Sequence, residues 1–224
     1  MKKASRKVLK VRVKRVIATL RKRYPTATTA LIHENPFQLL VSTILSAQCT
    51  DARVNMVTPG LFRKFPTPAH FAAVDQKELE VEIRSTGFFR NKARNIIAAS
   101  KSITEKYGGE VPRTMEELLQ LGGVGRKTAN CVLGGAFGIN EGVVVDTHVE
   151  RLSQRLGITK ERTAEKIERD LMEAVSRDSW YDFSNLLILH GREVCNARKP
   201  HCPTCDLKRL CPSAEGFLKT FYKR

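Results

Sequence analysis

The stretch LLQLGGVGRKTAN, residues 118–130, contains the turn that decides how this chain folds. Three glycines in it can adopt positive φ and let the backbone approach another molecule closely. The helix that follows has first-turn N–H groups without intrahelical partners, and helix N-termini bind anions. A tight turn between two ordinary helices is the alternative interpretation of the glycines alone. The residues predicted to contact a phosphate are Gly123, Val124, Gly125 and Arg126.

Apolar residues at spacings of three and four on both sides of this turn indicate an all-α chain. The only β-favouring run, Val143 to Val145, has no second run to pair with and is predicted to be buried extended chain. No linker rich in Gly, Ser or Pro divides the sequence. The predicted helices are Val8–Lys22 after a frayed start, one opened by Asn35-Pro36, one capped by Asp51 and ended near Pro59-Gly60, a short one from Asp75, Asn91–Tyr107 stopped by Gly108-Gly109, and Val149–Leu156.

The charge of the chain points to a polyanionic partner. It has 39 Lys+Arg against 23 Asp+Glu, a net charge of +16, and nucleic acid is the leading candidate. Eleven of the cations lie in residues 1–24, where no acid occurs, so this arm is expected to contact phosphates. Apolar stretches are too short for a membrane span and no export signal is visible. A cytoplasmic or nucleoid location without membrane association is therefore predicted.

Four cysteines near the C-terminus form the pattern C-x6-C-x2-C-x5-C. Thiolate is a soft ligand, so the pattern suggests Zn²⁺ or an iron–sulfur cluster, and spacing alone does not choose between them. Disulfides are the third interpretation, disfavoured by the missing secretion signal. Cys49 and Cys131 stand apart from this group and are expected to be buried thiols. The predicted metal ligands are Cys195, Cys202, Cys205 and Cys211.

Further segments, together with the hairpin and the cysteines, carry a resemblance to a known family. They are NPFQLLVSTILSAQCTD (35–51), RSTGFFRNKARNI (84–96) and VVVDTHVERLSQRLG (143–157). In this order and spacing the chain resembles the endonuclease III family of DNA glycosylase/AP lyases, in the helix-hairpin-helix superfamily. The resemblance covers roughly residues 30–212. One departure is Gly122, where the family usually has proline, so a more flexible loop with weaker phosphate docking is expected.

The resemblance implies two helical lobes with a DNA-binding cleft between them. Residues 27–140 would form a six-helix bundle with the helix-hairpin-helix. Residues 1–26 with 141–224 would form a second lobe whose cysteine loop holds a [4Fe-4S] cluster. The partner would be double-stranded DNA containing damaged bases or abasic sites, bound by a monomer.

The resemblance also assigns roles to single residues. Lys127 would be the nucleophile that attacks C1′ of a deoxyribose, and Asp146 the catalytic carboxylate, although an N-cap is the plainer reading of Asp146. Gln48 would fill the gap left by an extruded nucleotide. Phe88 would intercalate, with Phe89 an equal candidate on sequence alone. His148, next to Asp146, is expected to be structural.

The implied activity is excision of oxidised pyrimidines from duplex DNA in base excision repair, through a Schiff base and β-elimination. Two alternatives remain at this point. One is a monofunctional glycosylase for mismatched adenine or alkylated bases, against which Lys127 argues. The other is a non-enzymatic, cluster-bearing DNA-binding protein, for which the hairpin and the charge would suffice.

Overall fold

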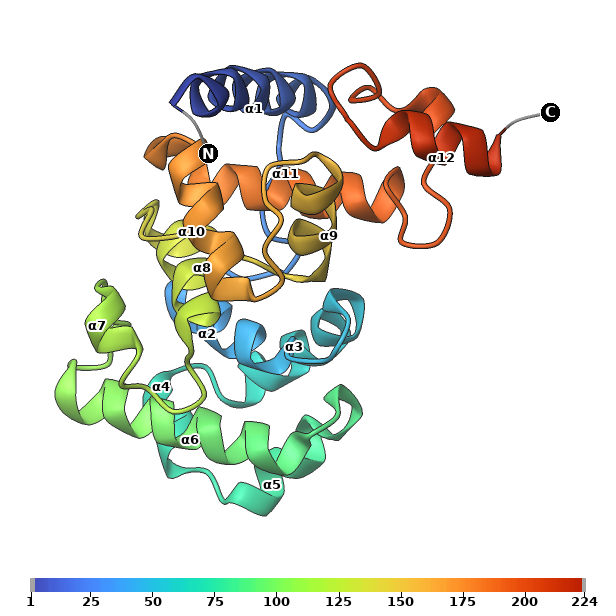
Figure 1. Ribbon diagram of the computed structural model, residues 1–224. Coiled ribbons are helices and arrows are strands. Elements are labelled where there is room, and N and C mark those ends of the chain that lie inside the picture. The colour runs from blue at the N-terminus through green and yellow to red at the C-terminus, as the bar shows by residue number, and fades with distance from the viewer. Residues whose placement is uncertain (1–2, 223–224) are drawn as a thin grey trace. The chain divides into compact units, whose positions relative to one another are not determined.

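The computed structural model describes residues 3–222, so residues 1–2 and 223–224 of the predicted second lobe lie outside the described part. Every regular element within residues 3–222 is a helix (Figure 1), which confirms the all-α prediction. The chain divides into two compact units, Thr29–Glu141 and the pair of segments Met1–Thr28 and Gly142–Arg224. None of the described helices is long and apolar enough to cross a membrane.

The unit Thr29–Glu141 contains six helices longer than one turn, one single-turn helix and one 3-10 turn. Phe71 lies fully buried at its centre, with ring centroids of Phe37 and Phe65 at 5.4 and 5.3 Å. The elements are α2 (Pro36–Leu45), α3 (Asp51–Lys64), α4 (Pro68–Ala73), α5 (Gln76–Glu82), η1 (Arg84–Thr86), α6 (Phe89–Lys106), α7 (Met115–Leu118) and α8 (Arg126–Phe137).

Local sequence explains where these helices begin. Asn35 caps α2 by accepting a hydrogen bond from the Gln38 N–H, and Pro36 fits the first helical position.

Helix α3 differs from the prediction in two ways. Its cap is Thr50 rather than Asp51, and it runs through Pro59 to Lys64. Proline costs a helix about 3 kcal/mol, and burial of the following apolar residue Leu61 offsets this loss.

Helix α6 lies unusually close to the hairpin between α7 and α8. A Cβ on Gly122 would lie 2.9 Å from both Asn95 O and Ala98 Cβ, and Gly123, at φ 74°, packs on the Asn95 side chain. Glycine at position 122 permits this close approach. The residue that was expected to make the loop more flexible therefore also lets the hairpin pack closely against α6. Helix α6 ends at Lys106, and Gly108 and Gly109 take positive φ, as the predicted stop requires.

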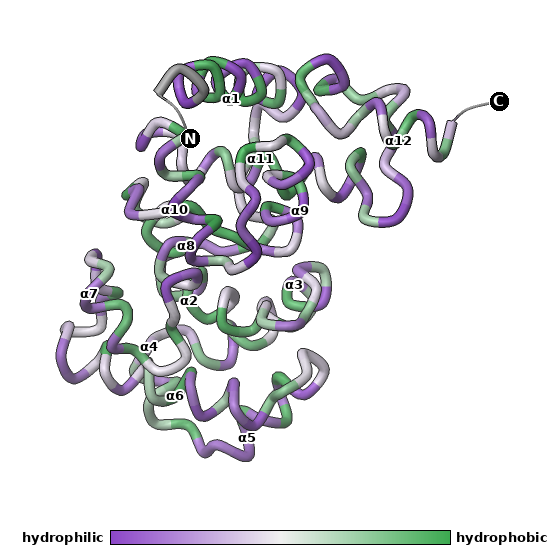
Figure 2. The backbone as a smooth tube through the Cα atoms, in the orientation of Figure 1, coloured by the Kyte–Doolittle hydropathy of each residue, from purple (hydrophilic) through white to green (hydrophobic). Residues whose placement is uncertain are grey.

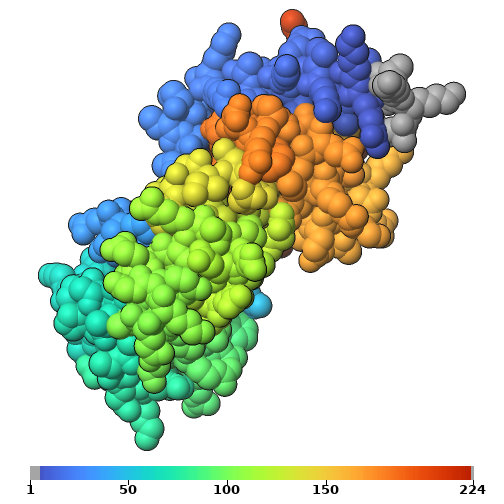
Figure 3. Space-filling model, turned by 90° about the vertical axis from the view of Figure 1, so that its left-hand side faces the viewer, coloured from blue at the N-terminus to red at the C-terminus, as the bar shows by residue number. Residues whose placement is uncertain are grey.

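The other unit combines the N-terminal helix with the C-terminal third of the chain. Its elements are α1 (Lys3–Arg23), α9 (Thr147–Arg155), α10 (Ala164–Ala174), η2 (Arg177–Ser179), α11 (Trp180–Glu193), η3 (Cys202–Thr204) and α12 (Ala214–Phe221). Helix α1 packs against α10 and α11, and Figure 3 shows the blue helix lying along the orange segment.

Helix α1 packs with one apolar stripe, as its spacing predicts. Val13, Val16 and Leu20 are buried in the core of this unit, and polar and apolar residues alternate along α1 in Figure 2. The prediction of a frayed start before Val8 is wrong, because the helix already includes Lys3. An ion pair of Arg6 with Glu173 adds to this early part of the helix.

The close approach at Gly122 generates a stability prediction. Gly122→Ala is expected to lower the free energy of unfolding by about 1–3 kcal/mol, because the new methyl group forces α6 and the hairpin apart. Gly125→Ala is the matched control, since nothing lies within 4 Å of a Cβ built there. It should cost less than about 1 kcal/mol, through a weaker N-cap. Urea denaturation measures both, and equal losses would contradict the packing argument.

Candidate functional site

The hairpin presents the start of α8 to solvent. Leu121 and Val124 are buried and anchor the turn, while Gly123 and Gly125 are exposed. Gly125 is the N-cap of α8 and supplies no side-chain acceptor. The first-turn N–H groups of α8 are therefore suited to an external anion such as phosphate. Lys127 is exposed in this first turn.

Two predicted DNA-contacting residues share a rare backbone conformation. Gln48 and Phe88 have φ values of 52° and 48°, and no other non-glycine residue among 3–222 has a positive φ. Such strain is concentrated at functional sites. Both side chains are exposed, Phe88 by 62%. Phe89 is half-buried against the core, so of the two aromatic candidates Phe88 carries the accessible ring.

A buried lysine lies between the segments that lead to these two residues. Lys92 is 4% exposed, and its Nζ donates to Leu45 O at 2.7 Å and to Thr86 O at 2.8 Å. Burial lowers the pKa of Lys92 from its ordinary value. Sequence reasoning missed this residue, because a lysine in a basic chain is by default a surface cation.

Asp146 is the N-cap of α9, as predicted. Its Oδ1 accepts hydrogen bonds from the N–H groups of His148 at 2.9 Å and Val149 at 2.8 Å. Burial lowers the pKa of His148, and the Arg151 guanidinium lies 3.1 Å from His148 Nδ1. Arg151 also donates to Gly191 O at 3.0 Å, which ties α9 to α11. These contacts agree with the expectation that His148 is structural.

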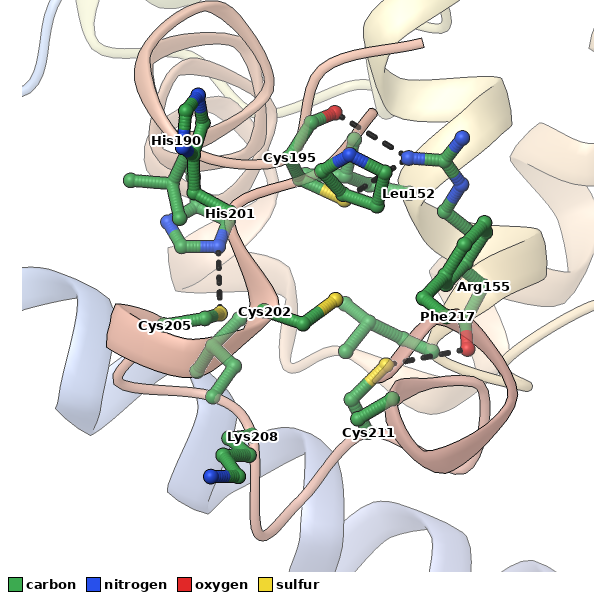
Figure 4. Close-up of a pocket in the computed structure, with 15 residues that line it drawn as sticks. Leu152, Arg155, His190, Cys195, His201, Cys202, Cys205, Lys208, Cys211 and Phe217 are labelled. Atoms are coloured by element: carbon green, nitrogen blue, oxygen red, sulfur yellow. Dashed lines mark hydrogen bonds between the residues drawn. The ribbon is translucent and has the colours of Figure 1, made fainter. Parts of the chain in front are cut away.

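The four C-terminal cysteines line one cavity (Figure 4). Cys195 follows α11, Cys202 begins η3, Cys205 follows η3, and Cys211 precedes α12. The space they line, including its part open to solvent, is about 430 Å³. All four are free thiols rather than disulfides. The sequence motif thus converges in space around a common volume.

Arginine and histidine side chains surround this cavity. Arg155 Nη1 lies 3.2 Å from Cys195 Sγ and donates to Asn196 O at 2.8 Å, while its guanidinium stacks 4.6 Å from the Phe217 ring centroid. Buried His190 places Nε2 3.4 Å from Cys205 Sγ, and burial lowers the pKa of His190 to about 4. Sequence reasoning missed Arg155. The signal that was available is its position four residues after Arg151, which places both arginines on the same face of a helix.

Thiolate is the form in which cysteine binds metal, and burial in this cavity disfavours it. Burial raises the pKa of Cys205 to about 11 and also raises the pKa values of Cys202 and Cys211. Buried thiolates therefore require positive charge beside them, and bound metal supplies it. Within residues 3–222 no three His, Cys, Asp or Glu side chains form a group close enough to hold a single metal ion.

The structure distributes the predicted residues over both units. Gln48, Phe88 and Lys127 belong to Thr29–Glu141, whereas Asp146 and the four ligand cysteines belong to the other unit. The prediction that Cys49 and Cys131 are buried is wrong, since both are half-buried. Cys49 lies in the turn that follows α2, and Cys131 lies on the less covered side of α8.

Comparison with known proteins places the chain in a family. Residues 41–177 match the HhH-GPD superfamily base excision DNA repair protein family. Endonuclease III of Synechocystis sp. is 56% identical over 92% of this chain and 94% of its own length. Endonuclease III of Bacillus subtilis is 49% identical over 84% and 86%.

Solved structures give the same result. A non-covalent endonuclease III–DNA complex has a TM-score of 0.88 and 44% identity, covering 94% of this chain and 99% of that one. A trapped covalent endonuclease III–DNA intermediate has a TM-score of 0.87 and 45% identity, covering 92% and 97%. With the helical fold, the glycine hairpin and the cysteine loop all in place, the chain belongs to the endonuclease III family.

Proposed function

We propose that this protein is a bifunctional DNA glycosylase and AP lyase that removes oxidised pyrimidines from duplex DNA in base excision repair. The observation that carries the proposal is the exposed Lys127 in the first turn of α8, beside a glycine hairpin that leaves backbone N–H groups open to phosphate. The similarity to an endonuclease III trapped covalently on DNA supports a covalent mechanism.

Lys127 supplies the nucleophile in this proposal. Its neutral amine forms a bond to C1′ of the damaged nucleotide, and the bond from C1′ to the base breaks with its electron pair moving to the base, which takes up a proton. The nitrogen then loses a proton and its electron pair breaks the bond from C1′ to O4′, which takes up a proton, so that the opened sugar is joined to Lys127 as a protonated imine. Loss of a proton from C2′ then expels the 3′ phosphate, which is β-elimination.

Asp146 stabilises positive charge as it develops on the sugar. Its carboxylate is held in place by the two N–H groups of α9, so it is ordered before substrate binds. A preorganised charge in this role contributes several kcal/mol to transition-state stabilisation, on the order of 3.

Gln48 and Phe88 give access to C1′. A nucleotide inside a duplex must rotate out of the stack before its sugar can be attacked, and the gap must be filled. The exposed Phe88 ring suits insertion between bases, and the Gln48 amide can both donate to and accept from the orphaned base. Gln48 and Phe88 have left-handed backbone conformations and lie in turns, so their side chains project from turns rather than from helices.

The cysteine loop is proposed to hold a [4Fe-4S] cluster through Cys195, Cys202, Cys205 and Cys211. When bound, such a cluster supplies four metal–thiolate bonds that fix an irregular loop. The loop exposes the cations Arg198, Lys199, Lys208 and Arg209, which are suited to phosphate contact.

The covalent step is tested by trapping. Borohydride is expected to link wild-type protein to duplex DNA containing an abasic site or an oxidised pyrimidine, because it reduces the imine. Lys127→Gln should trap nothing, since an amide cannot form that imine. Lys160→Gln, an exposed lysine on the other unit, is the control and should trap normally. Trapping retained in Lys127→Gln, seen on a denaturing gel, would place the nucleophile elsewhere.

The role of the Asp146 charge is tested by Asp146→Asn, because asparagine also caps helices well. Binding to a lesion duplex should persist while single-turnover cleavage slows by about a hundredfold or more. Asp75→Asn removes a carboxylate from another N-cap, that of α5, and should leave cleavage unchanged. Equal rates for Asp146→Asn and wild type would leave Asp146 only its capping role.

The metal content tests the cofactor. Purified protein is expected to be yellow-brown with about four irons per chain. Cys202→Ser should lose iron and weaken DNA binding, since a lost ligand removes folding free energy. Cys131→Ser, which alters a thiol outside the loop, should keep its iron. Zinc in place of iron, measured by elemental analysis, would overturn the assignment.

A further inference from the structure

Lys92 connects the two turns that carry Gln48 and Phe88. Its Nζ donates to Leu45 O, three residues before Gln48, and to Thr86 O, two residues before Phe88. Its own backbone N–H donates to Phe88 O at 3.1 Å. One residue therefore holds Phe88 from both sides and holds the approach to Gln48 at the same time.

The carbonyls that Lys92 binds belong to the last residues of two helices. Leu45 is the last residue of α2, and Cys49 N–H, which would extend that helix by bonding to Leu45 O, donates to Ser46 O at 3.1 Å instead. Thr86 ends η1. Carbonyls at helix C-termini carry partial negative charge, so an ammonium group is the matching donor. The lysine satisfies groups left unpaired by the two turns.

A stability role alone does not explain a charge at this position. Taking an ammonium group out of water is expensive, and desolvation lowers the pKa of Lys92 accordingly. An apolar side chain of similar volume fills a core at lower cost. Lys92 adds two hydrogen bonds from one ammonium group. These bonds fix the backbone at Leu45 and the backbone at Thr86 relative to each other.

We propose that Lys92 is a positioning residue that holds Gln48 and Phe88 in a fixed mutual arrangement, so that both enter the duplex together when a nucleotide is extruded. The assignment rests on the proposed function. Lys92 touches neither substrate nor reacting atoms in this role. It acts through the two left-handed turns, whose strained conformations persist because the surrounding structure holds them.

The first test measures insertion without chemistry. Wild-type protein is mixed with a duplex that carries a non-cleavable abasic analogue and 2-aminopurine next to the orphaned position, where unstacking raises fluorescence. Lys92→Met keeps the apolar stem and removes the donors. It is expected to reduce the fluorescence rise at saturating protein several-fold, while Lys101→Met, an exposed lysine on the same helix, leaves it unchanged.

The second test separates positioning from catalysis. For Lys92→Met, single-turnover cleavage of a paired abasic site should fall by about 10- to 100-fold, the range expected for misplaced groups. Cleavage of the same site in an unpaired bulge, where the sugar is already outside the stack, should change by less than about threefold. Equal losses on both substrates, or an unchanged fluorescence rise, would overturn the proposal.

A mutant cycle adds a measurement that a purely structural role of Lys92 would not affect. If Lys92 acts through the two turns, Lys92→Met added to Gln48→Ala/Phe88→Ala should cause no further loss on the paired site. Additive losses would reject the proposal. Thermal unfolding is followed throughout, and Lys92→Gln, which retains one donor group, should give an intermediate fluorescence rise.

The controls keep the two proposals distinguishable. If Lys92→Met and Lys92→Gln both fail to fold at any temperature, Lys92 is a core requirement and the positioning role is rejected. If wild-type protein cleaves neither abasic substrate, the proposed glycosylase and lyase activity fails. The fluorescence comparison of Lys92→Met with Lys101→Met still reports on positioning in that case.

Discussion

The approach of α6 to the glycine hairpin is the constraint on which the arrangement of residues 29–141 depends. Asn95 and Ala98 lie where any side chain on Gly122 would have to go. Phe88, Lys92 and Asn95 follow one another at spacings of four and three, so they share one face of α6 and its entry. A single helix face thus meets the glycine hairpin, the two carbonyls held by Lys92, and the Phe88 ring.

Helix α9 has a comparable position in the other unit. Asp146 caps its N-terminus, and Arg151 and Arg155 extend from it to the cysteine loop. The loop and the carboxylate are therefore fixed by the same nine-residue helix. This gives the cysteine loop a structural connection to Asp146.

Motifs and turn chemistry made much of this structure predictable. The glycine hairpin, the Asn35 and Asp146 caps and the glycine stop after α6 are local features, and each is set by residues close in sequence. Extension of α3 through Pro59 was not predictable in this way, because it depends on burial of Leu61 by distant residues. Lys92 and Arg155 were missed for the same reason, since their hydrogen-bond partners Leu45 and Asn196 lie 47 and 41 residues away in sequence.

The discontinuous unit has a consequence for biosynthesis. Helix α1 is made first, but its partners α10 and α11 are made only after the whole of residues 29–141. At about 5–20 residues per second, roughly ten seconds or more pass before they leave the ribosome. The stripe formed by Val13, Val16 and Leu20 has no core to enter during that interval, while the continuous unit can complete its own core. The lysines and arginines around this stripe keep the nascent segment hydrated, so the same cations that favour DNA in the finished protein oppose premature aggregation of the unfinished one.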